Sequence, residues 1–175
     1  MGNCALILID IQNFYFKEEQ SRLSDPEKAA SNAKKILDYF RESDKPVFFI
    51  KHCTGIDFDE NIYEGVKPLD NEKVIEKHYP SSFLETSLKE ELDKNNVKEV
   101  CIVGMMSHMC VDTTARACQD YGYKVTVIDD ACNTKDLVYN NEVIKAEVVH
   151  KVFMASLSGM FADIKMTEEF LKENK

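Results

Sequence analysis

Three residues of this chain offer a nucleophile, a base and a cation: Cys110, Asp10 and Lys77. A cysteine reacts as its thiolate, so it needs a base to take its proton and a nearby cation to stabilise the negative charge. An aspartate and a lysine meet these two needs. Together, the three side chains could form an activated nucleophile.

Each of the three residues also has a plain structural interpretation. Free cysteine is among the most buried residue types, so Cys110 could be an inert thiol in a core helix. Asp10 could cap a helix or a loop, and Lys77 could be a surface charge. The residue types and their positions along the chain leave these alternatives open.

Predicted strands end at or just before these residues. Residues 4–9, CALILI, form a continuous apolar run that ends at Asp10, as expected of a parallel strand covered on both faces. Residues 74–77 form a short strand that ends on Lys77, and residues 100–103 form a buried strand. Right-handed crossovers bring the carboxyl ends of parallel strands to one edge of a sheet, where such folds bind ligands.

The segment after Gly104 is expected to present Cys110. The pattern becomes helical from Ser107, whose hydroxyl suits an N-cap. Cys110 would then lie in the first helical turn. Unpaired N–H groups and the positive end of the helix dipole there favour the thiolate.

The remaining pattern predicts one α/β domain spanning residues 1–175. Further strands are predicted at 47–50, 124–129 and 161–164, and helices from Asp25-Pro26, at 83–92, from 107, at 136–157 and from Thr167. This alternation predicts a three-layer αβα, Rossmann-like fold with a parallel sheet of about six strands. The loop at 54–72 and the segment 133–141 are expected to shape a pocket.

The composition narrows the class of partner and the compartment. A net charge of −9 over 175 residues argues against nucleic acid or an anionic membrane as a partner. No apolar run approaches the ~20 residues of a membrane span. The six cysteines form no CxxC pair, which favours reduced thiols over disulfides or a zinc site. Since no basic leader precedes the first strand, we expect a cytoplasmic protein.

Three stretches resemble the isochorismatase-like cysteine hydrolases, a family that includes nicotinamidases and N-carbamoylsarcosine amidohydrolase: ALILIDIQNFY, VIEKHYPSSF and GMMSHMCVDTTARACQDYGYKVTVIDDAC. The resemblance covers nearly the whole chain. It implies that Asp10, Lys77 and Cys110 are a catalytic triad, with Asp10 as general base and acid and Lys77 stabilising the thiolate. It also implies a non-proline cis peptide at Met105–Met106, and the backbone N–H groups of Met106 and Cys110 as oxyanion donors.

One departure from that family concerns metal binding. Nicotinamidases carry an Asp-x-His pair and a further histidine after the second strand, and these hold a metal. This chain has Lys51-His52-Cys53-Thr54 there, and its following loop has no second histidine. We therefore expect no catalytic metal and no cofactor.

The retained cysteine favours hydrolysis of a carbon–nitrogen bond in a small molecule. Two alternatives remain open: cleavage of a vinyl ether, as by isochorismatase proper, which does not depend on a cysteine, and a non-hydrolytic thiol redox or binding protein. A dinucleotide-binding domain is disfavoured, because GMMSHM lacks the GxGxxG pattern. An aspartyl-phosphate enzyme is also disfavoured, because Asp10-Ile11-Gln12 lacks a second carboxylate for magnesium.

Several further residues are candidates for the substrate pocket. Phe14 and Phe83 are expected to form an apolar wall because they closely follow Asp10 and Lys77. The other candidates are His52, Ser107 and Met109, and His108 lies at the same expected mouth. By resemblance, the chain is expected to form a homodimer or a larger homo-oligomer.

Overall fold

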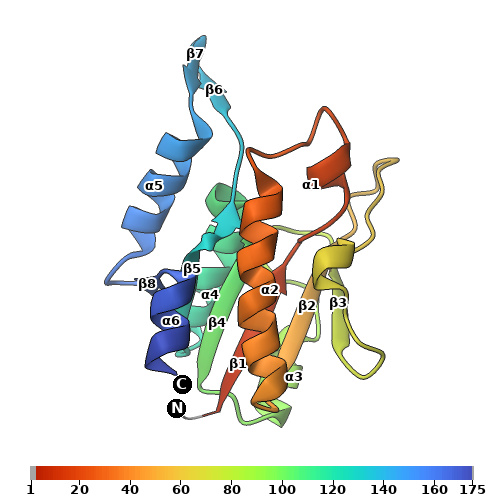
Figure 1. Cartoon of the computed structure of the whole chain (residues 1–175), viewed down its shortest axis with the longest axis vertical. Coiled ribbons are helices and arrows are strands. Elements are labelled where there is room, and N and C mark those ends of the chain that lie inside the picture. Colours follow the sequence, from red (N-terminus) through yellow and green to blue (C-terminus); the bar gives the residue numbers. More distant parts are fainter. Residues whose placement is uncertain (1–2, 175) are drawn as a thin grey trace.

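A six-stranded parallel sheet forms the middle layer of the structure, a computed structural model that describes residues 3–174 (Figure 1). Its strands are β1 (Cys4–Ile9), β2 (Val47–His52), β3 (Lys73–Lys77), β4 (Glu99–Met105), β5 (Lys124–Asn133) and β8 (Asp163–Lys165). They lie in the order β3-β2-β1-β4-β5-β8, and neighbouring strands pair in parallel. The chain order reverses between β1 and β4, which is where open α/β sheets bind ligands.

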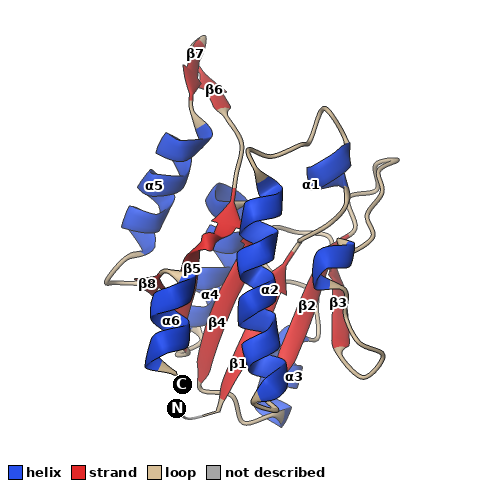
Figure 2. Cartoon of the chain, viewed as in Figure 1, coloured by secondary structure: helices blue, strands red, loops and turns tan. Residues whose placement is uncertain are grey.

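Helices cover both faces of this sheet (Figure 2). The helices are α1 (Phe14–Lys17), α2 (Pro26–Glu42), α3 (Leu88–Lys94), α4 (Asp112–Asp120), α5 (Ala146–Leu157) and α6 (Thr167–Glu173). One hydrophobic cluster includes residues of α2 and α6, and a second includes residues of α3, α4 and α5. The predicted three-layer α/β fold is therefore confirmed. None of the helices within residues 3–174 is long and apolar enough to cross a membrane.

The alternation of side chains along β1 explains why this strand lies in the middle. All six of its residues are buried. Cys4, Leu6 and Leu8 belong to the cluster under α2, whereas Ala5, Ile7 and Ile9 belong to the cluster on the opposite face. A strand with a period of two and apolar residues on both faces can be buried only between two helical layers.

The helix predicted at 83–92 forms only in its second half, as α3. Upstream, the Thr86 hydroxyl donates to the backbone oxygen of Ser82, and Ser82 itself bonds to Thr114. Glu85 adopts a left-handed conformation with φ of 55°. Hydroxyls that bond to nearby backbone groups compete with helix formation, so Phe83 lies in a turn and not on a helix.

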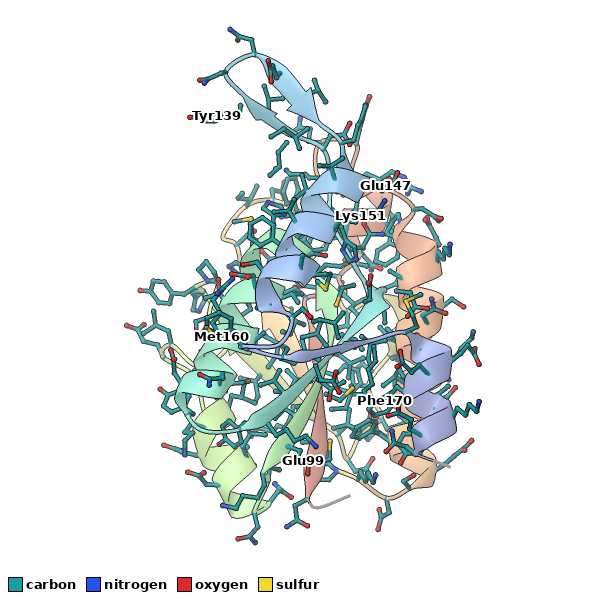
Figure 3. The ribbon with its side chains drawn as sticks, turned by 90° about the vertical axis from the view of Figure 1, so that its left-hand side faces the viewer. Glu99, Tyr139, Glu147, Lys151, Met160 and Phe170 are labelled. Atoms are coloured by element: carbon teal, nitrogen blue, oxygen red, sulfur yellow. The ribbon has the colours of Figure 1, made fainter. Side chains whose placement is uncertain are left out.

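The prediction of a helix over residues 136–157 is also wrong for the first part of that range. A two-stranded hairpin, β6 (Leu137–Tyr139) and β7 (Glu142–Ile144), precedes α5. Asn140 and Asn141 have φ of 50° and 63°, and asparagine favours such hairpin turns, so this pair was the missed signal. Figure 3 shows the hairpin, with Tyr139, standing clear of the sheet.

Gly104 in β4 lets the backbones of β4 and β1 approach closely. Its φ is 134°, and a Cβ atom there would lie 2.0 Å from the carbonyl oxygen of Ile9. The pairing of β4 with β5 also shifts register between Ile102 and Gly104. Only glycine fits this position, directly before the segment that leads to Cys110.

Gly104→Ala is expected to destabilise the fold by several kcal/mol, because the added methyl group meets rigid backbone. Gly122→Ala is the matched control, since Gly122 has φ of 82° but no atom within 4 Å of the added Cβ. That variant should lose only about 1–2 kcal/mol, from backbone strain alone. Urea unfolding of both variants measures the difference, and equal losses would contradict this role for Gly104.

Candidate active site

A buried ion pair joins the ends of β1 and β3. The Nζ atom of Lys77 lies 2.8 Å from Oδ2 of Asp10, and both side chains are fully buried. Lys77 also donates hydrogen bonds to the backbone oxygens of Tyr79 and Pro80, at 3.0 and 3.4 Å. Asp10 leaves the strand with φ of 50°, while its N–H donates to the oxygen of Ile50. The sequence prediction that these two residues meet at one sheet edge is confirmed.

Cys110 lies beside this pair. It belongs to a π-helical turn, Ser107–Val111, that directly precedes α4, and it is 3% exposed. Its Sγ atom lies 3.9 Å from Nδ1 of His52, which in turn lies 3.8 Å from Oδ2 of Asp10. Ligand-type atoms of Asp10, His52 and Cys110 all lie within 4.8 Å of one another. The ends of β1, β2 and β3 and the turn after β4 therefore build one site.

Burial controls the protonation of this site. It raises the pKa of Asp10, and the Lys77 ammonium opposes the rise. Burial, together with the Asp10 carboxylate, raises the pKa of Cys110 to about 12, again against the effect of Lys77. The sequence predicted a favoured thiolate, whereas burial and the Asp10 carboxylate favour the thiol of Cys110. Cys110 rests as a thiol, and Asp10 is a stronger base than an ordinary aspartate.

The turn that carries Cys110 follows a cis peptide and is held by hydrogen bonds to other elements. The Met105–Met106 peptide is cis, as the family resemblance implied. Ser107 does not cap the helix, and the N-cap prediction is wrong. Its buried hydroxyl bonds instead to Nδ1 of His150 at 2.7 Å, and Nε2 of His150 bonds to Asp129 at 2.6 Å. The chain Ser107–His150–Asp129 thus ties the turn to α5 and β5.

Sequence reasoning missed His150 and Gln12 as parts of the site. His150 lies 43 residues from Ser107, so no local spacing could reveal the contact. Gln12 is fully buried, and its side chain bonds to both the backbone N–H and the carbonyl oxygen of His52. It holds the end of β2 against the segment after β1. Burial lowers the pKa of His52, which favours the neutral imidazole.

The other predicted pocket residues lie in different surroundings. Phe14 packs against Tyr15 and Phe58 in the cluster under α2. Phe83 belongs to the opposite cluster, which also contains Cys110, and its ring contacts the exposed ring of Tyr121. The two phenylalanines therefore pack in the hydrophobic clusters on opposite faces of the sheet.

Two further candidates lie on the turn itself. Met109 is 41% exposed next to Cys110. His108 bonds through Nδ1 to the Thr134 hydroxyl at 2.5 Å. Of the pocket candidates, His52 is thus the one whose contact with both Cys110 and Asp10 is established.

Comparison with known proteins gives a consistent set of relatives. The family model described as the isochorismatase domain matches residues 4–168. YddQ of Bacillus subtilis, an uncharacterized isochorismatase family protein, is 46% identical over 96% of this chain and 98% of its own length. Nicotinamidase 3 of Arabidopsis thaliana is 29% identical over 85% of this chain and 80% of its own.

A solved structure agrees with these matches. The crystal structure of an isochorismatase from Pseudomonas putida is 33% identical and superimposes with a TM-score of 0.90, covering 95% of this chain and 89% of the other. The match of the family model over nearly the whole chain, and the fold, point to one conclusion. This chain belongs to the isochorismatase family of hydrolases.

Proposed function

We propose that the chain hydrolyses a carbon–nitrogen bond of a small molecule through a thioester on Cys110. The observation that carries the proposal is the buried Asp10–Lys77 pair beside the Cys110 thiol. This arrangement offers a nucleophile, a base of raised pKa and a fixed cation. A nicotinamidase among the relatives, by its name an enzyme that acts on an amide, supports this bond type.

In the proposed first step, the S–H proton of Cys110 passes to Asp10 while the sulfur attacks the carbonyl carbon. The Lys77 ammonium offsets the negative charge that the Asp10 carboxylate and the attacking sulfur share. The backbone N–H groups of Met106 and Cys110 would donate to the developing oxyanion, each contributing about 3 kcal/mol to the lowered barrier.

In the second step, the tetrahedral intermediate collapses and the C–N bond breaks. The leaving amine takes the proton back from Asp10, and a thioester remains on Cys110. Asp10 then removes a proton from water, which attacks the thioester. The C–S bond breaks, the acid is released, and the proton passes from Asp10 to the Cys110 sulfur. The thiol and the carboxylate return to their starting protonation states, so the cycle closes without any other reactant.

The alternatives fit the site less well. A redox-sensing cysteine is a low-pKa, accessible thiol, whereas Cys110 is buried and its pKa is raised. Cleavage of a vinyl ether needs no thiol and leaves the position of Cys110 beside the Asp10–Lys77 pair without a purpose.

Cys110→Ala is expected to abolish turnover while the fold survives, because a small apolar side chain replaces a buried thiol. A panel of primary amides, ureido acids and lactams provides the assay, with circular dichroism as the test of folding. Cys53→Ala is the matched control, since Cys53 lies at the end of β2 but is only partly buried. Hydrolysis by folded Cys110→Ala at the wild-type rate would refute the mechanism.

Lys77→Met is expected to abolish activity and to lower the free energy of unfolding by about 3–5 kcal/mol, because the Asp10 carboxylate stays buried without its partner. The double variant Asp10→Asn/Lys77→Met should regain most of that stability but no activity. Asparagine suits position 10 because it tolerates the left-handed backbone conformation found there. Urea unfolding and turnover measure the two effects, and a double variant as unstable as Lys77→Met would contradict the account.

We also propose that catalysis needs no metal, because the nicotinamidase ligand set is missing from Lys51-His52-Cys53-Thr54. Glu60 contacts this segment, and its carboxylate accepts hydrogen bonds from the backbone N–H and the hydroxyl of Thr54. Dialysis against EDTA should therefore leave kcat and KM unchanged. A loss of turnover that added Zn²⁺ or Fe²⁺ restores would show a catalytic metal.

A further inference from the structure

Three potential metal ligands of different chemistry converge beside the nucleophile. They are the Asp10 carboxylate, Nδ1 of His52 and Sγ of Cys110. Sγ and Nδ1 are 3.9 Å apart, and Nδ1 and Oδ2 of Asp10 are 3.8 Å apart. One oxygen, one nitrogen and one sulfur ligand form a donor set that suits Zn²⁺ better than Mg²⁺ or Ca²⁺.

Two of the three separations between these ligand atoms are close to those in a zinc site. Zinc bonds of about 2.3 Å to sulfur and about 2.0–2.2 Å to nitrogen and oxygen place tetrahedral ligand atoms about 3.4–3.6 Å apart. The two distances above exceed that range by only a few tenths of an ångström. The third separation, between Sγ of Cys110 and the Asp10 carboxylate, lies within 4.8 Å, so binding also requires the Cys110 side chain to move toward Asp10.

The carboxylate is available as a ligand. Lys77 makes an ion pair with Asp10 at 2.8 Å, yet neither buried oxygen of Asp10 accepts a hydrogen bond of good geometry from the described residues. One cation therefore leaves lone pairs of this carboxylate unused. A buried polar group in that state gains much from a second partner.

His52 is ready to be the nitrogen ligand. Gln12 bonds to both the backbone N–H and the carbonyl oxygen of His52, so the backbone that carries the ring is held in place. The Nδ1 atom of His52 is the ring nitrogen that faces both Sγ of Cys110 and Oδ2 of Asp10. Its side chain is 20% exposed, which places it between the solvent and the buried atoms of Asp10 and Cys110.

We propose that Asp10, His52 and Cys110 bind Zn²⁺ or a similar thiophilic divalent cation, and that this cation inhibits the enzyme. Two of the three ligands are the proposed base and nucleophile, so this site differs from a metal site that anchors a substrate. On binding, the S–H bond of Cys110 breaks, a sulfur–metal bond forms, and the proton leaves to the buffer. The binding claim stands on the geometry alone, whereas inhibition rests on the proposed function.

The test of binding needs no substrate. Metal-free protein is titrated with Co²⁺, which is expected to produce the near-ultraviolet thiolate-to-metal charge-transfer band, and Zn²⁺ is expected to remove it by displacement. Cys110→Ser should lose the band. His52→Ala should weaken Zn²⁺ binding about 100-fold or more, since the loss of even an outer-shell partner typically costs 10–100-fold.

Two control variants separate this site from adventitious binding. Cys53→Ser removes a more accessible thiol at the end of the same strand, and His78→Ala removes an exposed imidazole whose Nδ1 contacts the Cys53 oxygen. Both should bind Co²⁺ as the wild type does. A wild type without the charge-transfer band, a band that survives in Cys110→Ser, or a band lost in either control would overturn the proposal.

The inhibition claim is tested separately, with the amide panel. Micromolar Zn²⁺ should lower turnover of the wild type, and EDTA should restore it fully. If the binding experiment succeeds and no substrate is turned over in the absence of metal, the proposed function fails and the metal site stands. If turnover is found and saturating Zn²⁺ leaves it unchanged, the inhibition claim fails alone.

Discussion

The ion pair between Asp10 and Lys77 is the interaction on which the rest of the site depends. Removing two charges from water costs several kcal/mol per ion, and their attraction repays it only when further polar contacts are made. Here the Lys77 ammonium also meets two backbone oxygens, those of Tyr79 and Pro80. The pair reaches across β2, from the end of β3 to the end of β1, so it requires the observed strand order. Chemistry and fold therefore constrain one another.

Cys110 depends on a second constraint, the path of the chain after β4. Gly104 allows β4 to approach β1 closely, and the Ser107–His150–Asp129 hydrogen bonds fix the turn that follows. The thiol is thereby held next to the ion pair and rests in its neutral form. In the proposed reaction, this thiol passes its proton to Asp10 at the moment of attack.

Much of this architecture could be predicted from the sequence, because strongly apolar runs such as CALILI define parallel strands and their carboxyl ends. The position of Asp10 at the end of β1 follows from that pattern. Contacts made by side chains far apart in the sequence could not be predicted, as with Ser107 and His150, or Gln12 and His52. Two helices that apolar spacing predicted do not form over their full length. The Thr86 hydroxyl bonds to the backbone of Ser82 in one, and left-handed Asn140 and Asn141 form a hairpin turn in the other. The raised pKa of Cys110 depends on burial, which a helix-end argument ignores.

The central claim is that Cys110 becomes covalently acylated during turnover, and rapid acid quenching of the wild type with a hydrolysed amide tests it most directly. Intact mass and peptide mapping of the quenched protein should show the acyl group of the substrate on the peptide that contains Cys110. The adduct should be absent from Cys110→Ala and should disappear as the substrate is exhausted. Steady turnover with no acyl group on Cys110 at any quench time, together with activity in Cys110→Ala, would contradict the account.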